Sequence, residues 1–236
     1  RALSSAASDV YKRQVFWIDT ERKAYFWIIG IATFLITWNL YYTGYFDAAT
    51  SFRHALFQTV SIASTTGFAS SDFNLWPDFS RYVLLLLMFV GGCSGSTAGG
   101  MKVSRFVILL KVTWAELRRT IHPRLVYSIK MGGRNVPPVV VGNVTRFFYL
   151  YMIVFSTLTL LISLTGISML DSMGIIAACM SSVGPAFGIV GPTATYADVS
   201  TFGRLVVIAA MILGRLEIFT LLIIMRPDFW RVKRNW

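Results

Sequence analysis

This 236-residue sequence is short of charged residues, and most of all of acids. Charged residues make up 14% of the chain, with 11 Asp and Glu against 22 Lys and Arg. A typical soluble domain has about 25% charged residues. Hydrophobic residues instead reach 55%, and the mean hydropathy is +0.61. The composition therefore argues against a soluble domain and predicts a membrane protein.

Cysteine and histidine are also scarce. Cys93 and Cys179 are the two cysteines, both in apolar or Gly-rich segments, and the chain has two histidines. This supply gives neither a disulfide framework nor a metal-ligand cluster. Because no Ser-His-Asp or metal-ligand arrangement is visible either, the sequence predicts no enzyme activity and no cofactor.

The basic residues are concentrated in two places. Residues 102–146 hold nine Lys or Arg against one acid, and residues 226–236 hold four against one. By contrast, residues 44–81 have two Arg against three Asp, and residues 166–204 have one Arg against two Asp. This positive-inside asymmetry places the first two segments in the cytoplasm and the other two toward the outside. It also argues against nucleic acid as the partner of the positive charge.

Four hydrophobic stretches are expected to span a bilayer, which takes roughly 20 residues of helix. Two of them carry no charge over 20 and 24 residues. A third is interrupted after Val90 by a Gly-rich run, so we expect a broken membrane helix. The fourth is apolar apart from Arg204, Arg215 and Glu217. The expected spans are residues 24–43, 82–90 continuing at 101–117 after the break, 147–170 and 202–225.

Two shorter apolar segments, 54–64 and 173–182, lie between these spans. Each has about ten residues, too few to cross the bilayer, and each runs into a glycine. Non-helical backbone at membrane depth is tolerated only where it is buried in protein or lines a wet cavity. We therefore expect two re-entrant pore helices, each ending in an ion filter. The filter segments are Thr65-Thr66-Gly67-Phe68 and Ser182-Val183-Gly184-Pro185.

The order of span, half-helix, glycine turn and span occurs twice. Aligning the copies sets Gly67 over Gly184 at an offset of 117, and Asp78 over Asp198 at an offset of 120. Both copies begin and end on the same side of the membrane, which predicts a parallel duplication. The expected parts are an N-terminal segment at 1–23, a pore unit at 24–121, a cytoplasmic basic linker at 122–144 and a pore unit at 145–236.

Four motifs in this order resemble the Trk/Ktr/HKT potassium transporters. They are the two filter segments, the Gly-Ser-Thr run at 91–100 and the Gly-Arg-Leu-Glu-Ile-Phe-Thr sequence at 214–220. The resemblance covers roughly residues 20–236. It implies an all-α membrane protein with a potassium-channel-like pore built of four repeats, each an M1 helix, a pore helix and an M2 helix. This chain corresponds to the third and fourth repeats, and its cargo is expected to be K⁺, taken up across the cytoplasmic (inner) membrane.

The filter is expected to bind the ion through backbone carbonyls. Rings of carbonyl oxygens can replace the hydration shell of K⁺ without adding charge. Glycine at 67 and 184 permits the backbone angles that turn carbonyls toward an axis. The expected K⁺ ligands are Thr65, Thr66, Gly67, Phe68, Ser182, Val183, Gly184 and Pro185.

By the same resemblance, the Gly-rich run is an intramembrane loop that gates the pore below the filter. Its residues are Gly91, Gly92, Cys93, Ser94, Gly95, Ser96, Thr97, Ala98, Gly99 and Gly100. Arg215 is expected to raise the barrier to cations while the gate is closed, with its partner in this loop. Glu217 is a poorer partner, because residues two apart on a helix do not face each other.

Other interpretations of the Gly-rich run are weaker. A nucleotide-binding P-loop needs Lys directly after the last glycine, and here Met101 intervenes before Lys102. A packing face of small residues without any gating role stays open. Sodium selectivity is the alternative for the pore, although in this superfamily it is associated with serine in place of a filter glycine.

The expected partners follow from the missing repeats. Residues 1–14 are interpreted as non-native sequence, and the chain as a gene fragment that lacks the N-terminal half of the same transporter. The rival is a half-size protein that pairs two copies to complete the pore. The basic linker is expected to contact anionic membrane lipid, or to dock the cytoplasmic nucleotide-binding subunit on which members of this family sit as homodimers.

Overall fold

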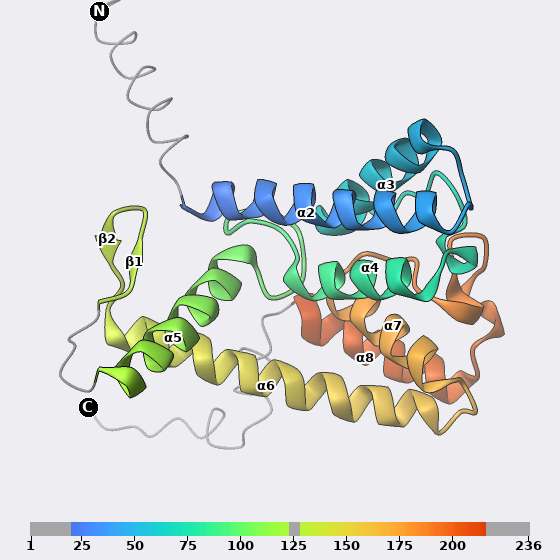
Figure 1. The fold of residues 1–236 in the computed structure, drawn as a ribbon. Coiled ribbons are helices and arrows are strands. Elements are labelled where there is room, and N and C mark those ends of the chain that lie inside the picture. The colour runs from blue at the N-terminus through green and yellow to red at the C-terminus, as the bar shows by residue number, and fades with distance from the viewer. Residues whose placement is uncertain (1–19, 123–127, 216–236) are drawn as a thin grey trace, which may run out of the picture.

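The computed structural model describes residues 20–122 and 128–215, and the regular secondary structure of this part of the chain is helical except for one short hairpin (Figure 1). The α-helices are α2 (Thr20–Tyr42), α3 (Ala48–Ala63), α4 (Asp78–Val90), α5 (Val103–Ile121), α6 (Pro138–Ser163), α7 (Met169–Met180) and α8 (Thr201–Arg215). Three 3₁₀ turns are η1 (Phe73–Leu75), η2 (Gly188–Val190) and η3 (Tyr196–Asp198). The prediction of an all-α fold therefore agrees with the described structure, apart from the hairpin.

Helices α2 and α6 are long and apolar enough to cross a membrane by length and composition. Helix α2 agrees with the expected span. Helix α6 begins at Pro138, nine residues before the expected start, because polar residues of its first turns do not stop a helix and Pro suits its first position. It ends at Ser163 rather than 170, and Gly166 at φ +86° turns the chain into α7.

Both half-helices begin earlier than expected, because each has a side-chain cap that hydropathy does not reveal. Helix α3 starts at Ala48, and the Asp47 carboxylate accepts a hydrogen bond from the Thr50 N–H at 3.3 Å. Hydrogen bonding from Thr50 lowers the pKa of the Asp47 carboxyl group below its ordinary value. Helix α7 starts at Met169, where the Ser168 hydroxyl accepts from the Asp171 N–H at 3.2 Å. Such caps supply acceptors for the first N–H groups of a helix.

The expected broken helix is present. Helix α4 ends at Val90, Gly91 takes φ +68°, and the chain resumes as α5 at Val103. The span expected at 202–225 corresponds to α8, which starts at Thr201 and is described as far as Arg215; Glu217 and the rest of that span lie outside the described residues.

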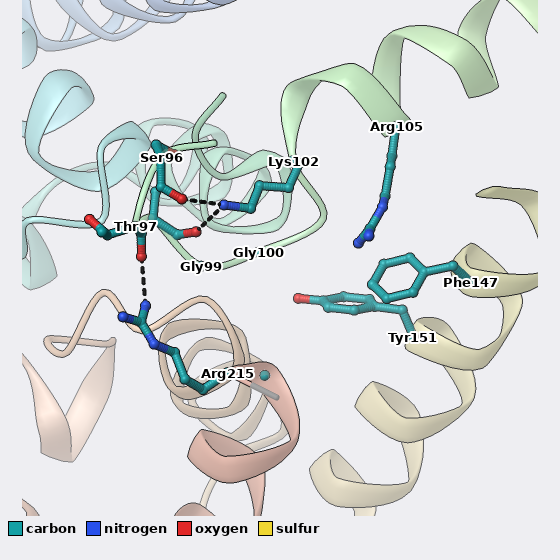
Figure 2. A pocket seen from close by; sticks show the side chains of 11 residues that line it. Ser96, Thr97, Gly99, Gly100, Lys102, Arg105, Phe147, Tyr151 and Arg215 are labelled. Atoms are coloured by element: carbon teal, nitrogen blue, oxygen red, sulfur yellow. Dashed lines mark hydrogen bonds between the residues drawn. The ribbon is translucent and has the colours of Figure 1, made fainter. Parts of the chain in front are cut away.

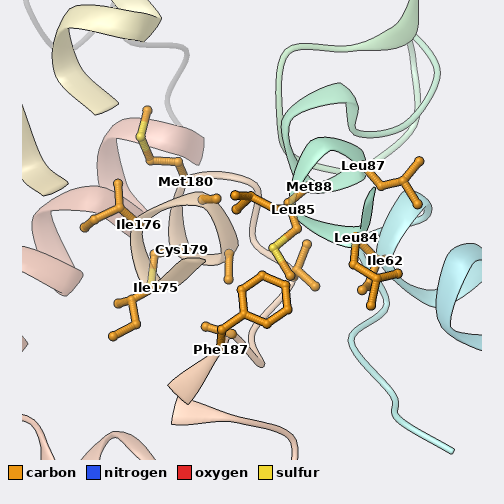
Figure 3. Close-up of a cluster of buried hydrophobic side chains, with 14 of the residues drawn as sticks. Ile62, Leu84, Leu85, Leu87, Met88, Ile175, Ile176, Cys179, Met180 and Phe187 are labelled. Atoms are coloured by element: carbon orange, nitrogen blue, oxygen red, sulfur yellow. The ribbon is translucent and has the colours of Figure 1, made fainter. Parts of the chain in front are cut away.

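The helices form two groups in sequence order. Figure 1 shows α2, α3 and α4 together on one side and α6, α7 and α8 on the other. Contacts between α4 and α7 join the groups. Buried apolar side chains from both groups fill this junction (Figure 3), among them Ile62, Leu84, Met88, Ile175, Ile176, Met180 and Phe187.

The linker contains a small antiparallel hairpin that the all-α prediction missed. Strand β1 (Lys130–Met131) pairs with β2 (Arg134–Asn135) across a Gly-Gly turn. Two glycines at positive φ suit a tight two-residue hairpin, which was the available sequence signal. The hairpin lies against α5 and the start of α2, because the Lys111 ammonium donates to the Lys130 carbonyl at 2.6 Å and the Gly132 N–H donates to the Thr20 hydroxyl at 3.0 Å.

Candidate ion filter and Gly-rich loop

The two segments predicted as filters end their half-helices in the same way. We call residues 65–68 the first turn and residues 182–185 the second turn. Thr65 and Ser182, which are 117 positions apart, take φ values of +56° and +58°. Gly67 and Gly184, also 117 apart, take +80° and +104°. Positive φ in a residue with a side chain costs free energy and is concentrated at functional sites.

The hydrogen bonds of the two turns also correspond at this offset. In each, two N–H groups after the helix end donate back to carbonyls of its last turn, the pattern of a Schellman helix end. The first turn has Thr65 N–H to Ile62 O at 3.0 Å and Thr66 N–H to Ser61 O at 2.8 Å; the second has Ser182 N–H to Cys179 O at 3.2 Å and Val183 N–H to Ala178 O at 2.9 Å.

The fold brings the two turns into contact. A Cβ on Gly67 would lie 2.1 Å from the Val183 carbonyl oxygen and 3.1 Å from Cδ of Pro185. Only glycine fits so close to the backbone of the other turn. The fold therefore brings the two predicted sets of residues together, although 117 positions separate them.

Two of the eight carbonyls are held by protein donors. The Ser61 hydroxyl donates to the Phe68 carbonyl at 2.6 Å, and the Tyr196 hydroxyl donates to the Gly184 carbonyl at 2.7 Å. Sequence reasoning missed Tyr196, because nothing in the pattern of a 3₁₀ turn indicates which backbone group it will reach. Within residues 20–122 and 128–215, the other six carbonyls accept no hydrogen bond. They belong to Thr65, Thr66, Gly67, Ser182, Val183 and Pro185.

The Gly-rich loop, residues 91–100, packs against the end of α7 directly before the second turn. A Cβ on Gly99 would lie 2.1 Å from the Ser181 carbonyl oxygen, and one on Gly214 of α8 would lie 2.1 Å from that of Met180. The Ser181 hydroxyl in turn donates to the Met88 carbonyl of α4. The loop and α8 therefore both touch the backbone that leads into the second turn.

Two basic side chains hold three successive carbonyls of this loop (Figure 2). Arg215 Nη1 donates to the Thr97 carbonyl at 2.6 Å, which is the loop contact that the sequence predicted for it. Lys102 Nζ donates to the carbonyls of Ser96 at 2.8 Å and Ala98 at 2.7 Å. This role of Lys102 was not predicted, although a lysine two positions after a Gly-rich run was the available signal. At the far end of the loop, the Glu21 carboxylate accepts from the Ser94 N–H.

A cavity of about 260 Å³ lies beside the loop, between it, α5, α6 and α8. Arg105 lies with its guanidinium carbon 4.1 Å from the centroid of the Phe147 ring, and Tyr151 follows on the same helix. The lining residues are Ser96, Thr97, Ala98, Gly99, Gly100, Lys102, Arg105, Phe147, Tyr151, Gly214 and Arg215.

Comparison with known proteins identifies the family. The family model named TrkH, described as "Cation transport protein", matches residues 12–231. The chain belongs to the TrkH family of cation transport proteins. This membership makes it a mostly helical membrane protein, in agreement with the two candidate spans α2 and α6.

Curated relatives agree with the TrkH assignment. The chain is 42% identical over 221 residues to the "Trk system potassium uptake protein TrkH" of Vibrio parahaemolyticus, covering 92% of this chain and 44% of the relative. It is 37% identical over 222 residues to the protein of the same name in Escherichia coli K12, covering 92% and 45%. The chain thus spans less than half the length of these relatives.

A solved structure shows the same fold. The crystal structure of "the Potassium Transporter TrkH from Vibrio parahaemolyticus" matches with a TM-score of 0.83 at 40% sequence identity. The match covers 91% of this chain and 46% of that chain.

Proposed function

We propose that this chain supplies two of the four filter segments and the gate of a potassium uptake pore in the cytoplasmic membrane. The observation that carries the proposal is the set of six carbonyls that accept no protein hydrogen bond in two touching turns. Backbone carbonyls are strong acceptors that are almost always paired with protein or with water. Thr66 and Ser182 are exposed, so their carbonyls are accessible to water or to a cation, whereas Val183 is buried.

Two features suit these carbonyls to a dehydrated cation. Carbonyl oxygens replace ion hydration without a fixed charge that would trap the ion. Helices α3 and α7 also both end at the turns, so the negative ends of their dipoles face the same place. The names of the relatives, which describe potassium uptake proteins, point to potassium as the ion.

The two matching turns also support a duplication within the chain. In this proposal residues 24–121 and 145–236 are parallel units of helix, half-helix and helix, and residues 122–144 link them on the cytoplasmic side. The N-terminal half of the transporter supplies the remaining filter segments. A homodimer, membrane lipid and a cytoplasmic nucleotide-binding subunit at the basic face of α5 are the further partners we propose.

The Gly-rich loop acts as the gate in this proposal. It lies against the backbone before the second turn, and its carbonyls are held by Arg215 and Lys102. While these bonds hold, two positive charges stand beside the path that a cation leaving the filter would take. Movement of the loop must break them.

Growth rescue tests the proposed function. Cells that lack their own potassium uptake would express either the chain alone or the chain joined to the N-terminal half of the Vibrio parahaemolyticus relative, called here the joined protein. We expect only the joined protein to restore growth at low potassium. Rescue by the chain alone would mean that two copies complete the pore. If neither restores growth although both reach the membrane, potassium uptake is contradicted.

A further inference from the structure

Each predicted filter turn is followed by a loop that returns the chain to the next helix. We call residues 69–77, between the first turn and α4, the first return loop, and residues 186–200, between the second turn and α8, the second return loop. Figure 1 shows the two loops meeting at one end of the helices. Their contact is made by Asn74 of the first loop, which reaches the backbone of the second.

The Asn74 side chain pairs with both backbone groups of Gly188. Its Nδ2 donates to the Gly188 carbonyl at 3.1 Å, and its Oδ1 accepts from the Gly188 N–H at 3.0 Å. Because a backbone N–H can only donate and a carbonyl can only accept, both ends of the amide are matched. The pairing therefore needs an amide: leucine has a similar shape without either group, and an ionised aspartate has only acceptors.

The second return loop has room for Asn74 because a side chain is missing there. A Cβ on Gly191 would lie 1.8 Å from Nδ2 of Asn74. Asp72 orients the asparagine from its own loop, since one carboxylate oxygen accepts from the Asn74 N–H at 2.9 Å. The other oxygen accepts from the Thr193 hydroxyl of the second loop at 3.3 Å. The second loop is thus shaped around side chains of the first.

The matching position of the first return loop is held from its own half-helix. Ser71 and Gly188 are 117 positions apart, the offset that relates the two filter glycines. The Ser71 carbonyl accepts from Nε2 of Gln58 at 3.2 Å, and Gln58 lies on α3. The residue of α7 at the same offset from Gln58 is Ile175, whose side chain has no donor. The second loop therefore receives from the first loop the amide that α7 does not supply.

We propose that Asn74 is a positioning residue of the filter, which sets the second turn relative to the first. Gly188 lies three residues after Pro185, the last residue of the second turn. The Ala186 N–H donates to the Val190 carbonyl at 2.8 Å, so the chain between them is a closed turn that contains Gly188. Fixing Gly188 therefore also fixes the end of the second turn.

Two points of attachment define a geometry that one cannot. The turns touch where Gly67 meets the Val183 carbonyl. One such contact sets a distance, whereas a second also sets the orientation of one turn relative to the other. Selectivity for K⁺ depends on how the filter carbonyls are arranged around the ion. The effect of Asn74 on selectivity rests on the proposed function, whereas the pairing with Gly188 does not.

Hydrogen exchange measures the pairing without any transport. In the joined protein, mass spectrometry follows exchange of the N–H groups of residues 186–191, which include the Gly188 N–H bonded to Asn74. The variants are N74L and N74D. Q58L is the matched control, because it removes the corresponding amide at the first return loop. Rubidium uptake in competition with sodium, by the same proteins in proteoliposomes, measures the role in the filter.

We expect N74L to speed exchange in residues 186–191 about tenfold and N74D less, with Q58L leaving this segment unchanged. The preference for rubidium over sodium should fall about fivefold in N74L. N143L, at an exposed asparagine of α6, should leave both unchanged. N74D keeps the size and polarity of the side chain and tests the pairing even if N74L does not fold.

Three results would count against these expectations in different ways. Equal exchange in N74L and the parent protein would overturn the pairing. Faster exchange with an unchanged ion preference would overturn the role of Asn74 in the filter. Absence of rubidium uptake by the parent joined protein would contradict the proposed function instead, and the exchange of residues 186–191 would still decide the pairing.

Discussion

The helix before the second turn is buried along its last residues, whereas the helix before the first turn is exposed along one face. In α7, Ile175 to Met180 are at most 1% exposed. In α3, Phe57 and Val60 are 45% and 42% exposed, and Phe68 in the first turn is 72% exposed. The two turns nevertheless have matching backbone angles and hydrogen bonds. The shape of the turn is therefore a local property of each segment, and burial is not needed to produce it.

The contacts that hold the two turns in place also differ. The first turn is held by its own helix, because the Ser61 hydroxyl of α3 donates a hydrogen bond to the Phe68 carbonyl. The second is braced from far away in the sequence, by Tyr196 on the Gly184 carbonyl and by the loop and α8 against the end of α7. In the proposed function, the second turn is the one coupled to the Gly-rich loop, because the loop packs against Ser181 directly before that turn.

Alanine substitutions at Gly67 and Gly184 should give the largest effect on ion uptake. They distinguish a position where a side chain would collide with the other turn from one where it would only strain the backbone. A Cβ at Gly67 would strike the Val183 carbonyl oxygen at 2.1 Å, whereas nothing lies within 4 Å of one at Gly184. G67A is therefore expected to abolish rubidium uptake by the joined protein in proteoliposomes. G184A adds only the strain of positive φ, about 1–3 kcal/mol, and should reduce uptake about tenfold.

Gly166 provides the control for this pair, since it also has positive φ and open space but lies outside both turns. G166A should leave uptake within about twofold, because its strain falls on a connecting loop. Equal uptake by G67A and the parent protein would contradict the contact between the turns.

The second largest effect is expected from removing the hydrogen bond between Arg215 and the Gly-rich loop, which lies beside the second turn. R215Q loses the charge-assisted bond to the Thr97 carbonyl and one positive charge. Such a bond is worth about 1.5–3 kcal/mol, so flux is expected to rise about tenfold. R204Q, an exposed arginine at the other end of α8, is the control. Unchanged flux in folded R215Q protein would remove Arg215 from the gate.

The two hydroxyl braces give a smaller and paired effect. Y196F removes the donor to the Gly184 carbonyl, and S61A removes the donor to the Phe68 carbonyl. A neutral hydrogen bond contributes about 1 kcal/mol, so each change should lower the preference for rubidium over sodium about fivefold. Competition uptake measures this preference, with Y149F on the exposed side of α6 as the control. No loss in either variant would mean that these carbonyls are positioned without their donors.

The helix caps give the smallest expected effect. Hydrogen bonding from Thr50 lowers the pKa of Asp47, so its stabilisation of α3 is present above the ordinary pKa and is lost as pH falls through the lowered value. D47A should therefore lower Tm slightly at neutral pH, and the difference from the parent should vanish in strong acid. Ser168 does not titrate, so S168A should lower Tm by an amount that does not depend on pH. A pH-independent D47A effect would contradict this assignment.

Much of the helix arrangement could be predicted from the sequence, because it depends on hydropathy and on the positions of glycine. The spans, the break after Val90 and the two half-helices before Gly67 and Gly184 all follow from apolar length and backbone freedom. The early starts of α3 and α6 were missed because polar residues interrupt the hydropathy signal near the start of each helix without stopping it, Ser51 and Arg53 in α3 and Asn143 and Arg146 in α6. Tyr196 and Lys102 were missed because which carbonyl a side chain reaches depends on tertiary packing.

The central claim is that the bare carbonyls of the two turns hold the transported ion. Anomalous diffraction from crystals of the joined protein, soaked with thallium as a potassium substitute, tests it most directly. The account predicts an anomalous peak between the carbonyls of Thr65, Thr66 and Gly67 on one side and Ser182 and Val183 on the other. Thallium bound elsewhere in the protein, with none between these carbonyls, would contradict it.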